Sequence, residues 1–386
     1  MIPYGRQDVI QADIDCVVEV LKSDFLTQGP LVPQFEEAVK AHVGAKHAVA
    51  VNSATSALHI ACMALDLGPG DWLWTSPNTF VASANCALYC GAQVDFVDID
   101  PRTYTLCPKA LEAKLQQAEK EGRLPKIVIP VHFAGQPCDM STIHAMSEKY
   151  GFKIIEDASH AIGATYNDIK VGCCAHSDIT VFSFHPVKII TTGEGGMATT
   201  NNSELAERLI RLRTHGITSK SELMQARPVN EIWNYQQIEL GFNYRMTDIQ
   251  AALGVSQMGR LDAFVERRSE IAAEYDRALA ILPVVIPWRQ LGVCSSYHLY
   301  SIRIRESSCG KTQRQVYDSM RKKGVAVNLH YIPVHRQPYY EAMGFKKGDF
   351  PIAEEYYANA LSLPIYSNLS KSDQSYVIQT LKGIFK

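Results

Sequence analysis

Short apolar runs alternate with helix-length segments over the first half of the chain, from about residue 45 to residue 200. Each run is rich in β-branched or aromatic side chains and is followed by turn-forming or small polar residues. Buried strands of a mostly parallel sheet have this pattern. The predicted strands are residues 48–51, 72–75, 94–97, 127–131, 153–155 and 179–182.

The segments between these runs fit helices, among them 55–65, 79–89 and 141–150, the last with Ser141 as its N-cap. Strands that alternate with helices predict an α/β fold with doubly wound topology. In such sheets ligands collect at the carboxyl ends of the strands. We therefore expect the functional residues just after the first, fifth and sixth of the predicted strands.

A second, smaller unit is expected toward the C-terminus, because the order of the elements changes there. The sequence predicts a large domain over residues 1–250 and a small α+β domain over residues 251–386. The polar, aperiodic stretch 216–240 is predicted to be a mobile loop near the site. The elements predicted after residue 247 are a long helix over 248–282, a strand at 299–304, a helix near 311–323 and a strand at 325–329.

Composition narrows the function classes. The 38 Lys and Arg residues nearly balance the 40 Asp and Glu residues, so we expect no nucleic-acid partner. A hydrophobic content of 46% excludes disorder for most of the chain. We find no apolar stretch near the roughly 20 residues of a membrane span and no signal peptide, so a cytoplasmic protein is expected. The ten cysteines lack zinc spacing and are interpreted as reduced thiols, and no metal is expected.

One lysine stands just after the last predicted strand. Lys188 lies among glycines and hydroxyl side chains in the segment 183–196. Burial lowers the pKa of an ammonium group and exposes the nucleophilic amine, which Schiff-base chemistry with a carbonyl requires. Taken alone, the residue fits either a catalytic lysine or a solvated loop lysine.

Two carboxylates end the fifth predicted strand, and a histidine follows them. Glu156 and Asp157 are adjacent, so they point to opposite faces of the strand and only one can face a pocket. A buried aspartate against a heterocyclic nitrogen would keep that nitrogen protonated and make the ring an electron sink. A helix cap or a metal ligand is an equal alternative for this pair, and His160 completes the motif.

The third feature follows the first predicted strand. The residues at 52–57 are small or carry hydroxyls, and they precede a helix. A helix N-terminus of this kind offers backbone N–H groups and a positive dipole end to a phosphate. The glycines of a Walker loop or a dinucleotide fingerprint are missing, and a simple helix cap is an equal alternative.

Together these features match the needs of pyridoxal 5′-phosphate (PLP). They supply an imine-forming lysine, a carboxylate for a ring nitrogen and a phosphate cradle at neighbouring strand ends. The combination is far more specific than any one of its parts, and it predicts a PLP enzyme.

The whole chain resembles the DegT/DnrJ/EryC1/StrS family of sugar aminotransferases. These are fold-type I PLP enzymes that act on nucleotide-linked keto sugars, and the resemblance implies that fold, with a mostly parallel central sheet and a smaller C-terminal α+β domain. Six ordered stretches over nearly the full length carry the resemblance. They are residues 26–29, 52–55, 156–161, 183–188, 193–196 and 241–246.

The resemblance implies roles around the PLP ring. Lys188 forms the covalent bond to the cofactor, Asp157 pairs with the pyridine nitrogen, and Phe80 stacks on the ring. His160 is expected beside the phenolic oxygen, although a structural histidine is an alternative.

The resemblance also implies how the phosphate is held. Ser53, Ala54 and Thr55 would bind it together with Ser183, while Asn243 would reach it from the neighbouring subunit. A homodimer with shared active sites is therefore expected.

A closer likeness is to family members that aminate the C4 keto group of a UDP-linked 4-keto-6-deoxy-N-acetyl hexose in pseudaminic acid synthesis, with L-glutamate as the donor. The likeness is carried by residues 52–58, 183–192, 297–300 and 330–334. It implies that the nucleotide-linked keto sugar contacts Tyr4, Leu26, Thr27, His330 and Tyr331. For the tyrosines, core packing is an alternative.

Other functions compete with this interpretation. The sugar could be the D-xylo epimer or a GDP-linked 4-keto-6-deoxy sugar, as in perosamine synthesis. Some relatives carry histidine at the lysine position and dehydrate sugars, which Lys188 argues against. A non-catalytic regulator with the same fold is disfavoured, because the lysine, the carboxylate and the hydroxyls are all present.

Overall fold

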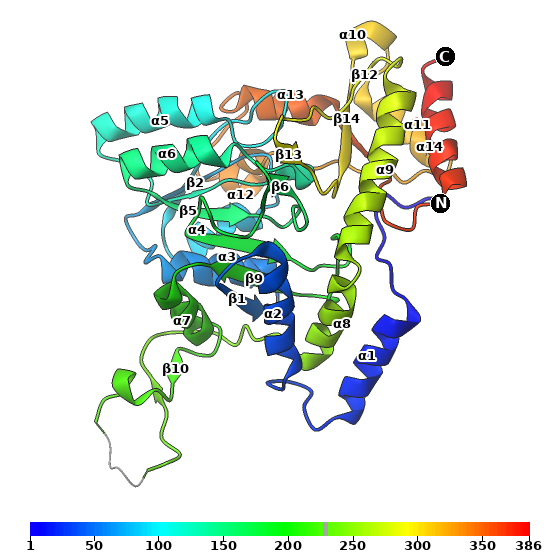
Figure 1. Cartoon of the computed structure of the whole chain (residues 1–386). Coiled ribbons are helices and arrows are strands. Elements are labelled where there is room, and N and C mark those ends of the chain that lie inside the picture. The colour runs from blue at the N-terminus through cyan, green and yellow to red at the C-terminus, as the bar shows by residue number, and fades with distance from the viewer. Residues whose placement is uncertain (227–230) are drawn as a thin grey trace.

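The computed structural model describes residues 1–226 and 231–386, and a seven-stranded sheet forms its centre (Figure 1). The strand order is β1-β9-β8-β5-β4-β2-β3, and β9 is antiparallel to both of its neighbours. The other neighbouring pairs are parallel. The strands are β1 (His47–Val51), β2 (Trp72–Thr75), β3 (Gln93–Phe96), β4 (Ile127–Ile129), β5 (Lys153–Asp157), β8 (Ile179–Ser183) and β9 (Gly196–Thr200).

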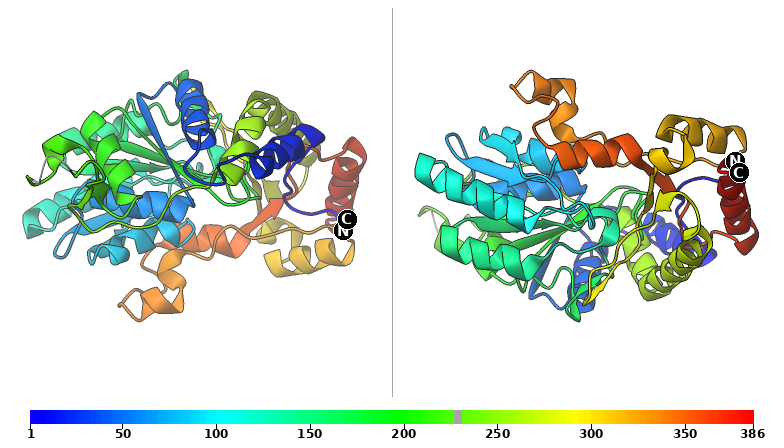
Figure 2. Two further views of the ribbon diagram at one scale, coloured as in Figure 1. Left: turned by 90° about the horizontal axis from the view of Figure 1, so that it is seen from below. Right: turned by 90° about the horizontal axis from the view of Figure 1, so that it is seen from above.

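Helices cover both faces of this sheet (Figure 2). Side chains of α3 and α4 pack on one face in a core with Leu73 and Ile155. Side chains of α5 and α6 pack on the other face with Trp74 and Ile154. Neighbouring residues of one strand thus enter different cores, as period-two geometry requires, and the α/β prediction is confirmed. The helices up to this point are α1 (Gln11–Lys22), α2 (Leu31–Val43), α3 (Ala54–Ala64), α4 (Ala82–Tyr89), α5 (Pro108–Glu121), α6 (Met140–Tyr150), α7 (Ser203–Leu212) and α8 (Asp248–Met258).

A second core lies in the C-terminal part of the chain. Side chains of α9, α11 and α14 pack there against β14 and β15, and Ile2 from the N-terminus joins them. The two termini therefore lie close together (Figures 1 and 2). The elements are α9 (Leu261–Leu279), β12 (Val284–Val285), β14 (Tyr300–Ile304), α10 (Glu306–Cys309), α11 (Gln313–Lys322), α12 (Pro338–Glu341), α13 (Pro351–Asn359), β15 (Ala360–Leu363) and α14 (Lys371–Ile384).

The second core does not hold every C-terminal element. Tyr340 of α12 and Tyr356 of α13 pack into the core of the large sheet, beside Phe96 and Phe133. The division at residue 250 stays a prediction.

Several predicted element ends were wrong. The N-cap of α6 is Asp139, whose carboxylate accepts the Thr142 N–H, and Ser141 lies inside the helix. The long helix predicted over 248–282 breaks at Gly259, a poor helix former, into α8 and α9. No strand forms at 325–329 within the described part of the chain, where only single bridges occur. Strand β9 was not predicted.

The stretch 216–240 contains a two-stranded pair, β10 (Ile217–Thr218) with β11 (Gln236–Gln237), and a short 3₁₀ turn at Ser221–Leu223. Residues 227–230 of the predicted loop lie outside the described residues. A further small sheet joins β13 (Val293–Cys294), β6 (Thr165–Tyr166) and β7 (Ile169–Lys170). Among the helices that the structure describes, none combines the length and apolar character needed to cross a membrane.

Candidate active site

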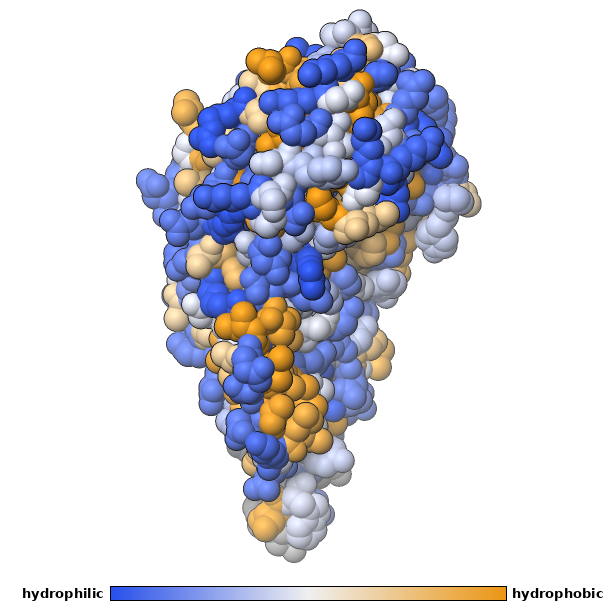
Figure 3. Space-filling model, turned by 90° about the vertical axis from the view of Figure 1, so that its right-hand side faces the viewer, coloured by the Kyte–Doolittle hydropathy of each residue, from blue (hydrophilic) through white to orange (hydrophobic). Residues whose placement is uncertain are grey.

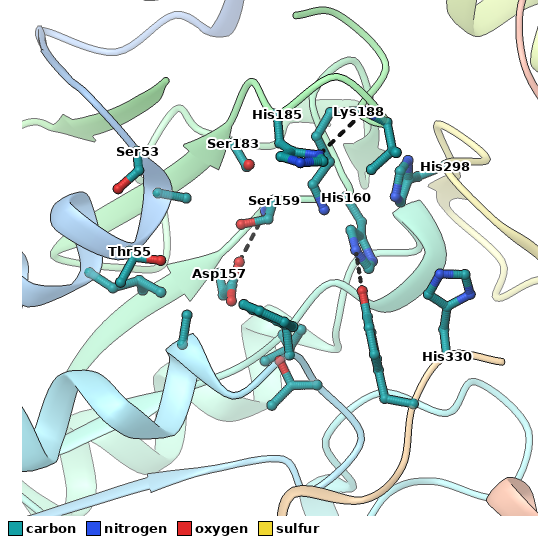
Figure 4. Close-up of a pocket in the computed structure, with 18 of the residues that line it drawn as sticks. Ser53, Thr55, Asp157, Ser159, His160, Ser183, His185, Lys188, His298 and His330 are labelled. Atoms are coloured by element: carbon teal, nitrogen blue, oxygen red, sulfur yellow. Dashed lines mark hydrogen bonds between the residues drawn. The ribbon is translucent and has the colours of Figure 1, made fainter. Parts of the chain in front are cut away.

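A cavity of about 570 Å³ opens at the carboxyl ends of β1, β5 and β8 (Figure 4). These are the three strands after which the sequence predicted the functional residues. The structure thus brings most of the predicted site residues together. Those that line the cavity are Tyr4, Ser53, Ala54, Thr55, Phe80, Asp157, His160, Ser183, Lys188, His330 and Tyr331.

Three predicted residues do not line this cavity. Thr27 forms a backbone bridge with Thr247, and Leu26 beside it is about half exposed. Asn243 forms a bridge with Thr214.

The N-terminus of α3 forms one side of the cavity. Ser53 is its N-cap, and its Oγ accepts the Ser56 N–H at 3.1 Å. The first backbone N–H groups of a helix, here those of Ala54 and Thr55, have no partner within the helix. Ser183, at the end of β8, adds a hydroxyl nearby (Figure 4). The donor set suits a phosphate.

Gly196 of β9 lets this turn lie close to the sheet. A Cβ atom at Gly196 would stand 2.5 Å from the Ser53 carbonyl and 2.6 Å from the Ala54 nitrogen. Such contacts are too short for any side chain, so glycine is required for the turn before α3 to take this position.

Asp157 faces the cavity from the end of β5. Its Oδ2 accepts the hydroxyl of Ser83 on α4 at 2.6 Å, and its Oδ1 accepts the Ser159 N–H at 3.0 Å. The Ser83 hydroxyl lies 2.8 Å from that of Thr79. The carboxylate is therefore fixed in orientation, and it is the group that a protonated ring nitrogen would meet.

Glu156 points to the opposite face of the sheet, as the alternation of side chains predicted. There its carboxylate lies 2.7 Å from the Nε2 atom of the buried His132 and accepts hydroxyls of Ser177 and Thr180. Burial disfavours the charged carboxylate, but these hydrogen bonds outweigh it and lower the pKa of Glu156. This carboxylate is satisfied without any ligand.

The amine of Lys188 reaches the floor of the cavity from the loop after β8 (Figure 4). Burial lowers its pKa from 10.5 to about 8, and the charge of Asp157 opposes that effect. A useful fraction of the lysine is therefore the neutral, nucleophilic amine near neutral pH.

A group of aromatic residues closes the side of the cavity opposite Ser53. The His160 Nδ1 accepts the Ala134 N–H at 3.3 Å, so its proton belongs on Nε2, which lies 3.1 Å from the Tyr331 hydroxyl. The ring of His298 lies against that of His160, with centroids 4.3 Å apart and the ring planes tilted by 38°. His330 bonds the Ser362 hydroxyl at 2.9 Å, and burial lowers its pKa to about 4.

Phe80 stands at the mouth of the cavity. Its side chain is 60% exposed, and its ring lies 6.4 Å from that of Tyr331. An exposed aromatic face beside a polar cavity is available for stacking on a flat ligand.

Sequence reasoning did not assign several lining or supporting residues, notably Ser83, Ser159 and His298. For Ser83, the only signal was its place in the helix after the second strand. His298 stands in a stretch that was noted for its likeness to sugar aminotransferases, and no role was given to it.

Residues 7–382 match the model of the DegT/DnrJ/EryC1/StrS aminotransferase family. The chain belongs to this family. Aminotransferases of the family use PLP, and the solved structures similar to this chain include forms named for PLP and for pyridoxamine phosphate. The chain is therefore a PLP-dependent sugar aminotransferase with the fold-type I architecture that the resemblance implied.

Named relatives cover almost the whole chain. The spore coat polysaccharide biosynthesis protein SpsC of Bacillus subtilis is 39% identical over 100% of this chain and 97% of its own length. The UDP-4-amino-4,6-dideoxy-N-acetyl-β-L-altrosamine transaminase of Campylobacter jejuni is 37% identical over 100% and 98%. Helicobacter pylori PseC, an aminotransferase involved in the biosynthesis of pseudoaminic acid, superposes with a TM-score of 0.90 at 30% identity, over 100% and 99%.

Proposed function

We propose that this aminotransferase moves the amino group of L-glutamate to C4 of UDP-2-acetamido-2,6-dideoxy-β-L-arabino-hex-4-ulose. The product is UDP-4-amino-4,6-dideoxy-N-acetyl-β-L-altrosamine, and the reaction belongs to pseudaminic acid synthesis. The observation that carries the proposal is the 37% identity, over the full chain, to the Campylobacter transaminase named for this product. A cytoplasmic location is part of the proposal.

The donor groups that line the cavity fit PLP. We assign the phosphate to Ser53, Ala54, Thr55 and Ser183, because their hydroxyls and free N–H groups line one side of the cavity. Gly196 supports this assignment, since it leaves room for the binding turn.

The ring of the cofactor is assigned to the groups around the cavity floor. Asp157 would hold the ring nitrogen, Phe80 would stack on the ring, and His160 would lie beside the phenolic oxygen. Bound PLP supplies an electron sink and a reversible carrier for the amino group.

Lys188 is the proposed proton carrier of both half-reactions. In the first, its Nζ would take the proton from the α-carbon of glutamate and pass it to the bound cofactor; in the second, it would take a proton back from the cofactor and deliver it to C4 of the sugar. The lowered pKa suits this role, because the amine must both accept and release a proton near neutral pH. The Asp157 carboxylate would accept a hydrogen bond from the ring nitrogen.

The sugar nucleotide is assigned to the side of the cavity lined by Tyr4, His330 and Tyr331. Leu26 and Thr27 lie outside the cavity lining, and we propose that they contact the nucleotide farther from the reacting carbon.

A homodimer is proposed from the exposed surface of α1. Ile10, Ile14, Val18 and Leu21 recur at helical spacing, and each is at least 36% exposed. Figure 3 shows a hydrophobic patch on the side of the molecule where α1 lies. In the dimer, Asn243 would reach the phosphate of the partner's cofactor. Light scattering of the wild type against Ile14→Asp with Val18→Asp tests this assembly, and a wild-type monomer would refute it.

The substrate is tested by comparing keto sugars at equal concentration, with glutamate and PLP-loaded enzyme. The L-arabino UDP sugar should turn over faster than its D-xylo epimer or GDP-linked 4-keto-6-deoxymannose. Lys188→Ala serves as the inactive control. A preference for either competitor would remove the substrate assignment and leave the aminotransferase standing.

The second candidate is an aminotransferase for another 4-keto-6-deoxy nucleotide sugar. The 39% identity to SpsC, whose name points to a spore coat polysaccharide, favours it. The same competition of sugars decides between the two candidates.

A further inference from the structure

His298 projects into the cavity from a tightly held backbone segment. The buried guanidinium of Arg268 donates to the carbonyls of Tyr297 and His298 at 3.1 and 3.3 Å, and also to that of Ile365. Tyr297 has a left-handed backbone conformation with φ of 48°. The position of the His298 ring is therefore built into the structure.

Further contacts tie this segment to the cavity wall. The Ser296 hydroxyl donates to the His160 carbonyl at 2.9 Å, and the Leu299 N–H donates to the Ala134 carbonyl at 3.3 Å. His298 and His160 are thus held together both by the contact between their rings and by their backbones.

The imidazole of His298 has unused hydrogen-bonding capacity. The residue is 5% exposed, and its Nδ1 is buried without a partner among the described residues. No hydrogen bond to its Nε2 is found there either, although the ring lines the cavity. Buried polar atoms in native structures are almost always paired, so a side chain left in this state beside a cavity points to a ligand.

The proton of this ring is best placed on Nε2. A proton on Nδ1 would be a buried donor without an acceptor, whereas a proton on Nε2 leaves only a lone pair unused at Nδ1. Burial lowers the pKa of His298 well below its ordinary value, and the charges of His160, Lys188 and Arg268 lower it further. The ring is therefore a neutral donor at neutral pH.

We propose that His298 contacts the substrate, with its Nε2–H donating a hydrogen bond to an acceptor oxygen next to the reacting carbon. Figure 4 shows His298 on the side of Lys188 away from Ser53 and Thr55, so it faces bound substrate rather than the phosphate cradle. The oxygen belongs either to the carboxylate of the amino donor or to the sugar. The inference rests on the aminotransferase reaction and not on which keto sugar is used.

The test compares His298→Phe, which keeps a ring in contact with that of His160, with His298→Gln, which keeps a donor. The two half-reactions are followed separately by the absorbance of the bound cofactor, with L-glutamate in one and the UDP-linked keto sugar in the other. His144→Phe, on α6 and outside the cavity lining, is the matched control.

For His298→Phe we expect the half-saturating concentration of one substrate to rise about 10-fold or more, and that of the other to change less than about 2-fold. For His298→Gln the rise should be smaller, because this variant keeps a hydrogen-bond donor. The affected half-reaction identifies the source of the oxygen. Dissociation of PLP and the melting temperature should stay at the control values.

Two results would overturn the proposal. One is a change under about 2-fold for both substrates in His298→Phe. The other is an equal rise in the half-saturating concentrations of both substrates, together with weaker PLP binding. That result would make His298 a structural support for His160. If His298→Phe is unstable, His298→Met replaces it in the comparison. Equal half-saturating concentrations in His298→Gln and His298→Met would then also refute the proposal. A failed sugar assignment would show instead as slow turnover by the wild type.

Discussion

Lys188 gives the sharpest test of the electrostatics of the cavity. Burial lowers the pKa of its amine from 10.5 to about 8. At pH 7 about 10% of such an amine is neutral, which is roughly 300-fold more than for a lysine of ordinary pKa. Only the neutral amine attacks an aldehyde, so this lysine should capture PLP at pH values where surface lysines do not.

The assay starts from enzyme stripped of PLP. The initial rate of growth of the yellow absorbance band is measured after adding PLP, over a series of pH values. Because deprotonation creates the nucleophile, the rate should rise with pH and reach half of its plateau near the pKa of about 8. Lys188→Ala should show no such band that survives gel filtration.

The variant Asp157→Asn tests the direction in which the pKa of Lys188 should move. The charge of Asp157 stabilises the ammonium form and raises the pKa of Lys188, against the larger effect of burial. Removing that charge should therefore move the midpoint to lower pH, even though the variant binds PLP less tightly. Asp95→Asn, at a carboxylate that pairs with Lys114 outside the cavity lining, is the control. A midpoint near the ordinary lysine pKa, or an upward shift in Asp157→Asn, would refute the reasoning.

Three further substitutions test the supports of the site. Ser83→Ala removes the hydroxyl that orients Asp157. Equilibrium dialysis should show PLP binding about 10-fold weaker, because a hydrogen bond to a charged group is lost. An unchanged dissociation constant would contradict this. Tyr331→Phe leaves the Nε2–H of His160 without its acceptor, so the sugar half-reaction should slow about 10-fold or more in single turnover, while PLP affinity stays within about 2-fold. Gly196→Ala forces a Cβ against the turn before α3. Thermal unfolding should show that the free energy of unfolding falls by about 1–3 kcal/mol, and PLP binding should also weaken. A variant as stable as the wild type would show that the turn can move.

The sequence could group the residues that we propose for the cofactor because each stands at the end of a strand or just after it. Asp157 ends β5, while Ser53 and Lys188 follow β1 and β8, and parallel strands bring their carboxyl ends to one edge of the sheet. The choice of Asp157 over Glu156 as the pocket residue needed the family resemblance. The period-two rule established only that one of the two could face the cavity.

Strand β9 could not be predicted, because its pattern is not that of a buried strand. It reads Gly-Met-Ala-Thr-Thr, yet all five residues are buried. The Thr199 hydroxyl donates to the Gly172 carbonyl at 2.8 Å, and the Thr200 hydroxyl donates to the Asp178 carbonyl at 2.7 Å. These hydroxyls are satisfied by loops distant in the sequence, so no local signal marks the strand as buried.

Ser83 and His298 escaped prediction for a related reason. Each is placed by a contact made only after folding: the Ser83 hydroxyl reaches Asp157 when α4 packs on the sheet, and the His298 ring meets that of His160 when the C-terminal part of the chain packs against the cavity. The local sequence does not indicate that a serine inside a helix, or a histidine before a strand, will make such a contact.

The substrate side of the cavity depends on how the C-terminal part of the chain sits on the large sheet. The Val334 N–H donates to the Pro77 carbonyl at 2.8 Å, and the Tyr331 N–H donates to the Asn78 amide oxygen at 3.3 Å. The cofactor side is instead built on the ends of the sheet's own strands. Because the two sides are held by different contacts, a change in the backbone around residues 328–334 can reshape the side of the cavity where we propose that the sugar binds, and leave the side around Ser53 as it is. This separation gives a physical route by which one cofactor site can serve aminotransferases for different sugars.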